Sequence, residues 1–157
     1  MLDNILGVES IVDEEETPMI RAAAKNDLDA VYCLMQQLSS HDFTKEQFES
    51  CFQQNLDSSY IMVYEEDGCV NGCGVLNIQY PLHFSQKKAE VVNLIVDANA
   101  RGKGIGKKIL HELVRIAALN DCVRIEVASN RRRTDAHRFY IREGFDDTHL
   151  KLTKGLA

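Results

Sequence analysis

Three glycines at alternate positions stand between an apolar run and an amphipathic one. They are Gly102, Gly104 and Gly106, and the run before them, 91–96, is rich in the β-branched residues typical of a buried strand. After them, apolar residues recur at helical spacing, at Ile105, Ile109, Leu113 and Ile116. Glycines leave backbone N–H groups uncovered, and a helix start adds unpaired donors and partial positive charge. This junction therefore predicts an anion site, most naturally for phosphate.

The residues at this junction exclude two common phosphate-binding loops. A dinucleotide fingerprint beginning at Gly102 would need glycine where the chain has Lys107. A Walker loop ending in Gly-Lys at 106–107 would need glycine at Arg101 and Ser or Thr at Lys108. The pattern that remains is R-x-x-G-x-G over 101–106, with lysines around it.

This pattern, placed between a strand and a helix, resembles the pyrophosphate-binding motif of the Gcn5-related N-acetyltransferases (GNAT superfamily), which hold acetyl-CoA. A second stretch is similar to the same family: Asn130 follows a predicted strand, Phe139-Tyr140 lies on a short helix, and Gly144-Phe145 comes after it. The resemblance covers residues 18–154. It implies a mixed α/β (α+β) structure, the acyl-CoA N-acyltransferase fold, with a central, mostly antiparallel sheet flanked by helices.

Within the superfamily, residues 135–145, Thr148-His149 and the ending 152–154 resemble the aminoalkylphosphonate N-acetyltransferases. The resemblance implies acetyl-CoA as cosubstrate and direct attack by the primary amine of a small molecule, through a tetrahedral intermediate. The loop before the central strand, with Lys87 and Lys88, departs from that pattern. A polyamine, an aminoglycoside or a protein N-terminus therefore stays open as the acceptor. A non-catalytic acyl-CoA-binding regulatory module is a further alternative.

Two side chains are candidates for the proton transfers of amine acetylation. An alkylammonium group, with a pKa of about 10, must lose a proton before its nitrogen can attack. Glu90, on the strand 89–96, is the candidate base, and its alternative role is an ion pair with Lys87 or Lys88. Tyr140 occupies the position of the family's acid and would protonate the leaving thiolate. Its alternative role is an aromatic anchor in the core.

The resemblance also implies a set of acetyl-CoA contacts. The backbone of the strand would hold the pantetheine arm and the oxyanion, the loop would hold the pyrophosphate, and Asn130 would add a contact after the next strand. The predicted contacts are Leu94, Ile95, Val96, Arg101, Gly102, Lys103, Gly104, Ile105, Gly106, Lys107 and Asn130. No metal site is predicted, because His111-Glu112 is followed by Arg115 where a second histidine would be needed.

Composition and charge restrict the remaining functions. The 157 residues are 45% hydrophobic and 27% charged, which is ordinary for a soluble globular protein, and no apolar run could span a bilayer. Five cysteines without framework spacing, and no visible signal peptide, predict a cytoplasmic protein. Residues 1–17 hold six acids and no Lys or Arg, so they are predicted to be an acidic extension before a single domain, 18–157. Residues 101–157 hold 13 basic and 7 acidic residues, which suits a polyanion such as CoA.

The predicted partners are a small-molecule amine and, from the family, a second copy in a homodimer. Nucleic acid is not predicted as a partner, since Arg131 to Arg133 lack interleaved aromatic residues. A membrane is not predicted either, because no apolar run is long enough to span one. Asn26 or Asp27 is expected to cap the first helix, and Thr44 with Gln47 to form a capping box for the second. The predicted order is strand 19–22, helices near 28–38 and 45–52, strands 60–64, 70–80 and 89–96, helix 104–119, strand 123–127, helix 135–142, and one or two strands within 145–153.

Overall fold

The strands form one sheet, in the order in which they occur along the chain. In the computed structural model, which describes residues 17–156, the strands are β1 (Met19–Ala22), β2 (Tyr60–Glu66), β3 (Cys69–Gln79), β4 (Lys88–Val96) and β5 (Arg124–Val127). Strands β1 to β4 form an antiparallel meander, and β4 pairs in parallel with β5. The predicted mixed α/β fold with a mostly antiparallel sheet is confirmed.

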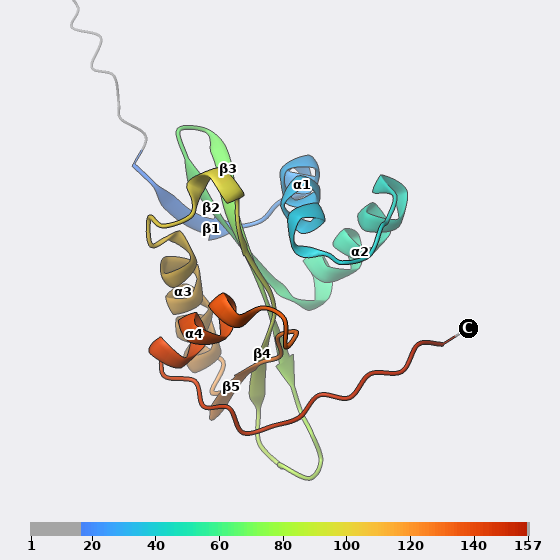
Figure 1. Ribbon diagram of the computed structural model, residues 1–157, viewed down its shortest axis with the longest axis vertical. Helices are drawn as coiled ribbons and strands as arrows, with labels where there is room; N and C mark the ends of the chain where they lie inside the picture. The colour runs from blue at the N-terminus through green and yellow to red at the C-terminus, as the bar shows by residue number, and fades with distance from the viewer. Residues whose placement is uncertain (1–16, 157) are drawn as a thin grey trace, which may run out of the picture.

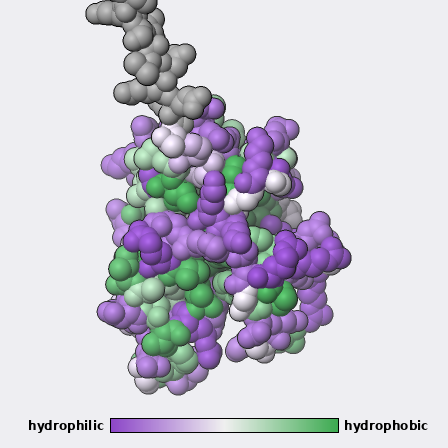
Figure 2. Space-filling model, turned by 90° about the vertical axis from the view of Figure 1, so that its left-hand side faces the viewer, coloured by the Kyte–Doolittle hydropathy of each residue, from purple (hydrophilic) through white to green (hydrophobic). Residues whose placement is uncertain are grey.

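Helices cover both faces of this sheet. One layer holds α1 (Leu28–Leu38) and α2 (Lys45–Ser58), and the other holds α3 (Ile105–Leu119) and α4 (Thr134–Arg142), as Figure 1 shows. Two short 3-10 helices, η1 (Lys25–Asp27) and η2 (Ala98–Ala100), precede α1 and follow β4. Figure 2 faces the α3/α4 layer, where apolar patches interrupt a hydrophilic surface. No helix within residues 17–156 combines the length and apolar character needed to cross a membrane.

Alternation of side chains along the strands creates two cores. In β2, Met62 and Tyr64 pack into the core under α3 and α4, while Ile61 and Val63 pack into the core under α1 and α2. The four predicted helices are present, because each presents an apolar stripe to one of these cores.

The two predicted helix caps have different outcomes. The capping box of α2 is confirmed: the Gln47 backbone N–H donates to Thr44 Oγ1 at 3.2 Å, and the Thr44 N–H donates to Gln47 Oε1 at 2.9 Å. The predicted cap by Asp27 is wrong. Its carboxylate instead accepts from both terminal nitrogens of Arg21, at 2.8 and 2.9 Å, and from the Ala24 N–H. The bidentate ion pair with Arg21 is stronger than a hydrogen bond to the start of the helix. It also holds the pKa of Asp27 below its usual value.

The predicted last strand, within 145–153, is wrong as well. Phe145 is anchored, because its N–H donates to the Tyr140 carbonyl at 3.0 Å and its ring lies 5.5 Å from the Tyr140 ring. Beyond it, residues 146–156 contain no strand and are all exposed. The alternation at Leu150 and Leu152 finds no neighbouring strand in the described part of its own chain. The predicted acidic extension, 1–17, lies outside the described residues except for its last residue.

Stability should fall as the pH rises above about 9, because of one cysteine at the centre of the sheet. Cys73 is fully buried, and burial raises the pKa of its thiol from 9.0 to about 12. Between these values the unfolded chain loses a proton that the folded chain keeps. Unfolding becomes easier by at most about 1.4 kcal/mol per pH unit. Denaturant unfolding between pH 8 and pH 11, expressed as a difference between wild type and Cys73→Ala, measures this slope; parallel curves would contradict it.

Candidate active site

A β-bulge in β4 opens the sheet at the place where the site was predicted. Val75 of β3 pairs with Asn93, but the next residue, Leu76, pairs with Val91. Val92 is therefore the extra residue, and its side chain is 42% exposed. A bulge bends its strand and increases the local twist. The pairing of β4 with β5 ends at the same point, with Val91 opposite Val127.

Beyond the bulge, β4 continues as far as Val96, and none of the described strands lies on its β5 side there. Backbone groups of Leu94, Ile95 and Val96 are thus presented toward the opening between β4 and the chain that follows β5. The Ile95 side chain is buried in one core, and those of Leu94 and Val96 pack against the other, so the three residues offer this opening mainly their backbone. Such an edge can pair with the amide groups of an extended ligand, as another strand would.

An unsatisfied hydroxyl stands on the other side of the opening. Ser129, two residues after β5, has the one side-chain polar atom in the described part of the chain that is fully buried and makes no hydrogen bond. A buried hydroxyl without a partner costs free energy, so this hydroxyl is available to a water molecule or to a polar group of a ligand. Together with the unpaired edge of β4, it fits the amide-rich pantetheine arm of acetyl-CoA.

The glycine loop approaches this opening from the end of β4. Gly102 and Gly104 have φ angles of +81° and +77°, and a Cβ atom on either would meet nothing within 4 Å. These two glycines therefore adopt a left-handed backbone and face open space. Gly106 differs, because a Cβ there would lie 3.6 Å from the Val96 side chain. A Cβ there would make an ordinary van der Waals contact with β4, so this position lies against the strand and does not face the opening.

The start of α3 supplies the donors of the predicted anion site. Gly104 is the N-cap of α3, so the N–H groups of Ile105, Gly106 and Lys107 are the unpaired donors of the first turn. The Ile105 side chain is buried, and only its backbone can contact a ligand. With the exposed Arg101 and Lys103, these donors can hold the two charges of a pyrophosphate.

The other cations near the loop have partners elsewhere. Lys107 lies 3.8 Å from Glu143, and Lys108 stands over the Tyr64 ring at 5.7 Å, on a different side of the helix. The loop itself is tied to α1, because Gln37 donates to Asp97 Oδ2 at 2.9 Å and accepts from the Ala98 N–H at 3.0 Å. This hydrogen bond is the largest cause that lowers the pKa of Asp97.

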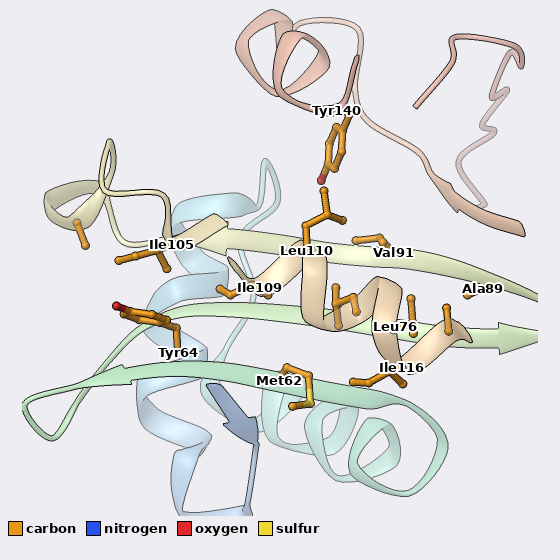
Figure 3. Close-up of a cluster of buried hydrophobic side chains, with 13 residues drawn as sticks. Met62, Tyr64, Leu76, Ala89, Val91, Ile105, Ile109, Leu110, Ile116 and Tyr140 are labelled. Atoms are coloured by element: carbon orange, nitrogen blue, oxygen red, sulfur yellow. The ribbon is translucent and has the colours of Figure 1, made fainter. Parts of the chain in front are cut away.

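Tyr140 extends from α4 toward α3. Figure 3 shows its ring projecting from α4 toward Leu110 of α3, with the hydroxyl at the leading end, above β4. The residue is 8% exposed, and its hydroxyl makes no hydrogen bond within residues 17–156. Burial raises the pKa of Tyr140 above its usual 10.0, and nearby Arg133 partly opposes the shift. The phenol is therefore protonated at neutral pH and free to donate. Its predicted alternative as a core anchor also holds, since it packs on Phe139 and Phe145.

Glu90 lies on the opposite face of β4. Because Ala89 and Val91 face the α3/α4 core, Glu90 points to the side of α1 and α2. There it accepts a hydrogen bond from Gln79 of β3. The neighbouring Glu126 accepts from Lys88 at 2.6 Å, so the predicted ion pair between Lys88 and Glu90 is replaced by one between Lys88 and Glu126. These polar side chains lie on the part of the sheet that α1 and α2 do not cover.

The predicted residues thus come from both faces of the sheet around β4. The glycine loop follows the end of β4, Tyr140 packs in the α3/α4 layer, and Glu90 lies on the other face of the strand. Asn130 lies beyond the end of β5, but its Oδ1 accepts from the Arg132 N–H at 3.0 Å and shapes the turn before α4. Sequence reasoning missed Ser129 and Gln37. Ser129 directly precedes Asn130, which is a usable signal, whereas the contact of Gln37 with Asp97 is long-range and has none.

The chain is similar in sequence and in fold to known acetyltransferases. The acetyltransferase (GNAT) family description matches residues 28–145. An aminoalkylphosphonate N-acetyltransferase of Salmonella typhimurium is 32% identical over 139 residues, covering 87% of this chain and 90% of that protein. Glucosamine 6-phosphate N-acetyltransferase 1 of Dictyostelium discoideum is 32% identical over 124 residues, covering 74% and 77%. An aminoglycoside N-acetyltransferase solved with CoA superposes with a TM-score of 0.79 at 17% identity, covering 88% and 94%.

Proposed function

Because the chain belongs to the acetyltransferase (GNAT) family and is an acetyl-CoA-dependent N-acetyltransferase, we propose that its acceptor is a small primary amine that carries a phosphorus oxyanion. The first candidate is an aminoalkylphosphonate. The observation that carries this proposal is the 32% identity to an aminoalkylphosphonate N-acetyltransferase over most of both chains. The second named relative acts on a sugar that also combines an amine with a phosphate, so the two names share one chemical class.

The polar face around Glu90 supports such an acceptor. Glu90 offers a carboxylate to the ammonium end, whereas Lys88 and Arg124 at the start of β4 and β5 offer positive charge. Glu126 partly neutralises both cations, at 2.6 and 3.8 Å. Lys87 adds a cation that forms no ion pair within the described residues and lies 6.0 Å from the centre of the Tyr80 ring. An acceptor with an ammonium group at one end and a phosphonate at the other matches this distribution.

In this proposal Glu90 and Tyr140 act on different protons. Bound acetyl-CoA supplies an activated thioester carbonyl. Glu90 removes a proton from the ammonium group, which makes the nitrogen nucleophilic. Backbone N–H groups of Leu94 to Val96 stabilise the negative charge that develops on the carbonyl oxygen. Collapse of the tetrahedral intermediate breaks the C–S bond, and Tyr140 gives its proton to the departing sulfur. The nitrogen loses its second proton to solvent, from which Tyr140 is protonated again. Because the two side chains lie on opposite faces of β4, the proton is taken on one side and given on the other.

Replacing Gly104 with alanine should weaken acetyl-CoA binding by about tenfold. A Cβ at φ +77° strains the backbone by roughly 1–2 kcal/mol, and relief of this strain shifts the loop away from the conformation in which the first N–H donors of α3 face the ligand. The matched control is Gly68→Ala, which introduces the same strain at φ +71° in the β2–β3 turn. Calorimetric titration with acetyl-CoA measures both variants. Equal affinities in the two variants would mean that the loop does not hold the cosubstrate.

An acceptor panel tests the proposed function directly. Release of CoA thiol is measured with aminomethyl- and aminoethylphosphonate, glucosamine 6-phosphate, the corresponding amines without phosphorus, a polyamine and an aminoglycoside. We expect kcat/KM to be at least about tenfold higher for each phosphorus-bearing amine than for its matched amine, the gain typical of one charged hydrogen bond. Equal rates within the pairs, or a preference for the polyamine, would contradict the proposal.

A further inference from the structure

One face of α4 packs across the first turns of α3. A Cβ added to Gly106 would stand 4.0 Å from the ring of Phe139, and the Tyr140 ring points toward Leu110 (Figure 3). Glu143, the C-cap residue of α4, follows Tyr140 by three positions. Residues three and four apart are neighbours on the surface of a helix, so the aromatic pair and this carboxylate lie on the same face. The face that meets α3 therefore ends in a charge.

Two side chains of α3 contact the Glu143 carboxylate. Its Oε2 lies 2.8 Å from His111 Nε2, and its Oε1 lies 3.8 Å from Lys107 Nζ. An ionised carboxylate only accepts hydrogen bonds, so His111 donates from Nε2. The Glu143 side chain is 14% exposed, although both of its partners are exposed residues. A hydrogen bond to a carboxylate that is shielded from water is stronger than one on the open surface.

This contact gives α4 a fixed orientation that apolar packing does not supply. Within residues 17–156, Glu143 is the one residue of α4 and its C-cap whose side chain hydrogen-bonds to another element. The chain that leaves the helix, 146–156, is exposed throughout. Apolar contacts are non-directional, whereas a hydrogen bond requires a particular distance and angle. The N–H groups of Glu143 and Phe145 both donate to the Tyr140 carbonyl, at 3.1 and 3.0 Å, so Tyr140 moves together with this end of the helix.

We propose that Glu143 is a positioning residue, which through its hydrogen bond with His111 fixes α4 on α3 and thereby places the Tyr140 hydroxyl. The first turn of α3 also presents the N–H donors of the proposed pyrophosphate site. The acid and the phosphate donors thus keep one fixed relation, which a cosubstrate that contacts both requires. Misplacing a reacting group by about 1 Å costs up to about 10²-fold in rate. The inference rests on the role of Tyr140 in the proposed function.

A single turnover of the full chain tests this role. Enzyme in excess over acetyl-CoA is mixed with the amine of the acceptor panel that reacts fastest in the wild type, and CoA thiol is measured. Glu143→Ala should slow this step by about tenfold and leave the KM for the amine unchanged. The matched control is Glu112→Ala, since the partner of Glu112, Arg115, lies on the same helix and the pair joins no two elements. Thermal unfolding checks that both variants fold. A wild-type rate in Glu143→Ala would overturn the proposal.

Conservative replacement distinguishes positioning from a contribution to stability alone. The side-chain oxygen in Glu143→Gln can still accept from His111, so this variant should stay within about threefold of the wild-type rate. His111→Ala should be as slow as Glu143→Ala, and the double variant no slower than either, because each change removes the same contact. A Glu143→Gln enzyme as slow as Glu143→Ala, or additive losses in the double variant, would refute positioning through His111.

The Tyr140→Phe background separates this inference from the proposed function. Once the hydroxyl is absent, Glu143→Ala should slow the reaction no further, since no acid remains to be positioned. A further tenfold loss in that background would mean that Glu143 acts on another group, contrary to the proposal. A Tyr140→Phe enzyme with the wild-type rate is a failure of the proposed acid. A slow Tyr140→Phe enzyme beside a fast Glu143→Ala enzyme is a failure of this inference alone.

Discussion

Replacing Tyr140 with phenylalanine will lower kcat by about 10²- to 10³-fold and leave the affinity for acetyl-CoA nearly unchanged. The ring still packs between Phe139 and Phe145, so only the hydroxyl is lost. That hydroxyl makes no hydrogen bond within the described residues, and the variant leaves no protein group there unsatisfied. Without it, the thiolate must leave unprotonated or take a proton from water. Steady-state kinetics and calorimetry on the same preparation separate the two effects.

The pH dependence supplies a second readout for Tyr140. Since burial raises its pKa above 10.0, the phenol stays protonated through neutral pH and the wild-type kcat should not fall on its account below about pH 10. The control is Tyr60→Phe, which removes a hydroxyl that donates to Asn120 Oδ1 at 3.1 Å, away from the opening. A Tyr140→Phe enzyme within threefold of the wild-type kcat would assign Tyr140 to packing alone.

Replacing Glu90 with glutamine should lower kcat/KM by about 10²-fold at neutral pH. The side-chain oxygen of glutamine can still accept from Gln79, so the variant removes the charge and the basic group with little change in shape. The deficit should shrink as the pH approaches 10, because more of the amine is then neutral in solution and needs no base.

A carboxylate on the outer surface of α3 provides the comparison for Glu90. Glu112→Gln breaks an exposed pair with Arg115 and should leave kcat/KM unchanged. A Glu90→Gln deficit that stays constant with pH would mean that the residue positions the amine and does not deprotonate it. The absence of any deficit would remove Glu90 from the site.

Local patterns predicted the parts of the site that depend on neighbours in sequence. The loop 101–106 could be recognised because glycine spacing, the preceding strand and the following helix are all short-range. The capping box at Thr44 and Gln47 is likewise a local signal. The different roles of the three glycines could not be read in this way. Whether a Cβ meets Val96, as at Gly106, or open space, as at Gly104, depends on how α3 packs on β4.

Features that depend on a distant partner escaped prediction. Asp27 looks like a helix cap until Arg21 of the first strand comes within 2.8 Å of it. The bulge at Val92 leaves no local mark, because an apolar run reads the same with or without an extra residue. The segment around Leu150 and Leu152 has the correct alternation for a strand, but alternation does not say whether a strand edge lies within reach.

In the proposed complex, the bulge at Val92 divides β4 into two halves that recognise their ligands by different means. The half from Lys88 to Val91 contacts the acceptor with its side chains, so a substitution on its polar face changes which acceptor is preferred. The half from Asn93 to Val96 meets the cosubstrate with its main chain, which every sequence supplies. The acceptor preference can therefore change, in evolution or by design, through substitution of residues such as Glu90. The affinity for acetyl-CoA stays the same, because the main chain that binds it is unchanged.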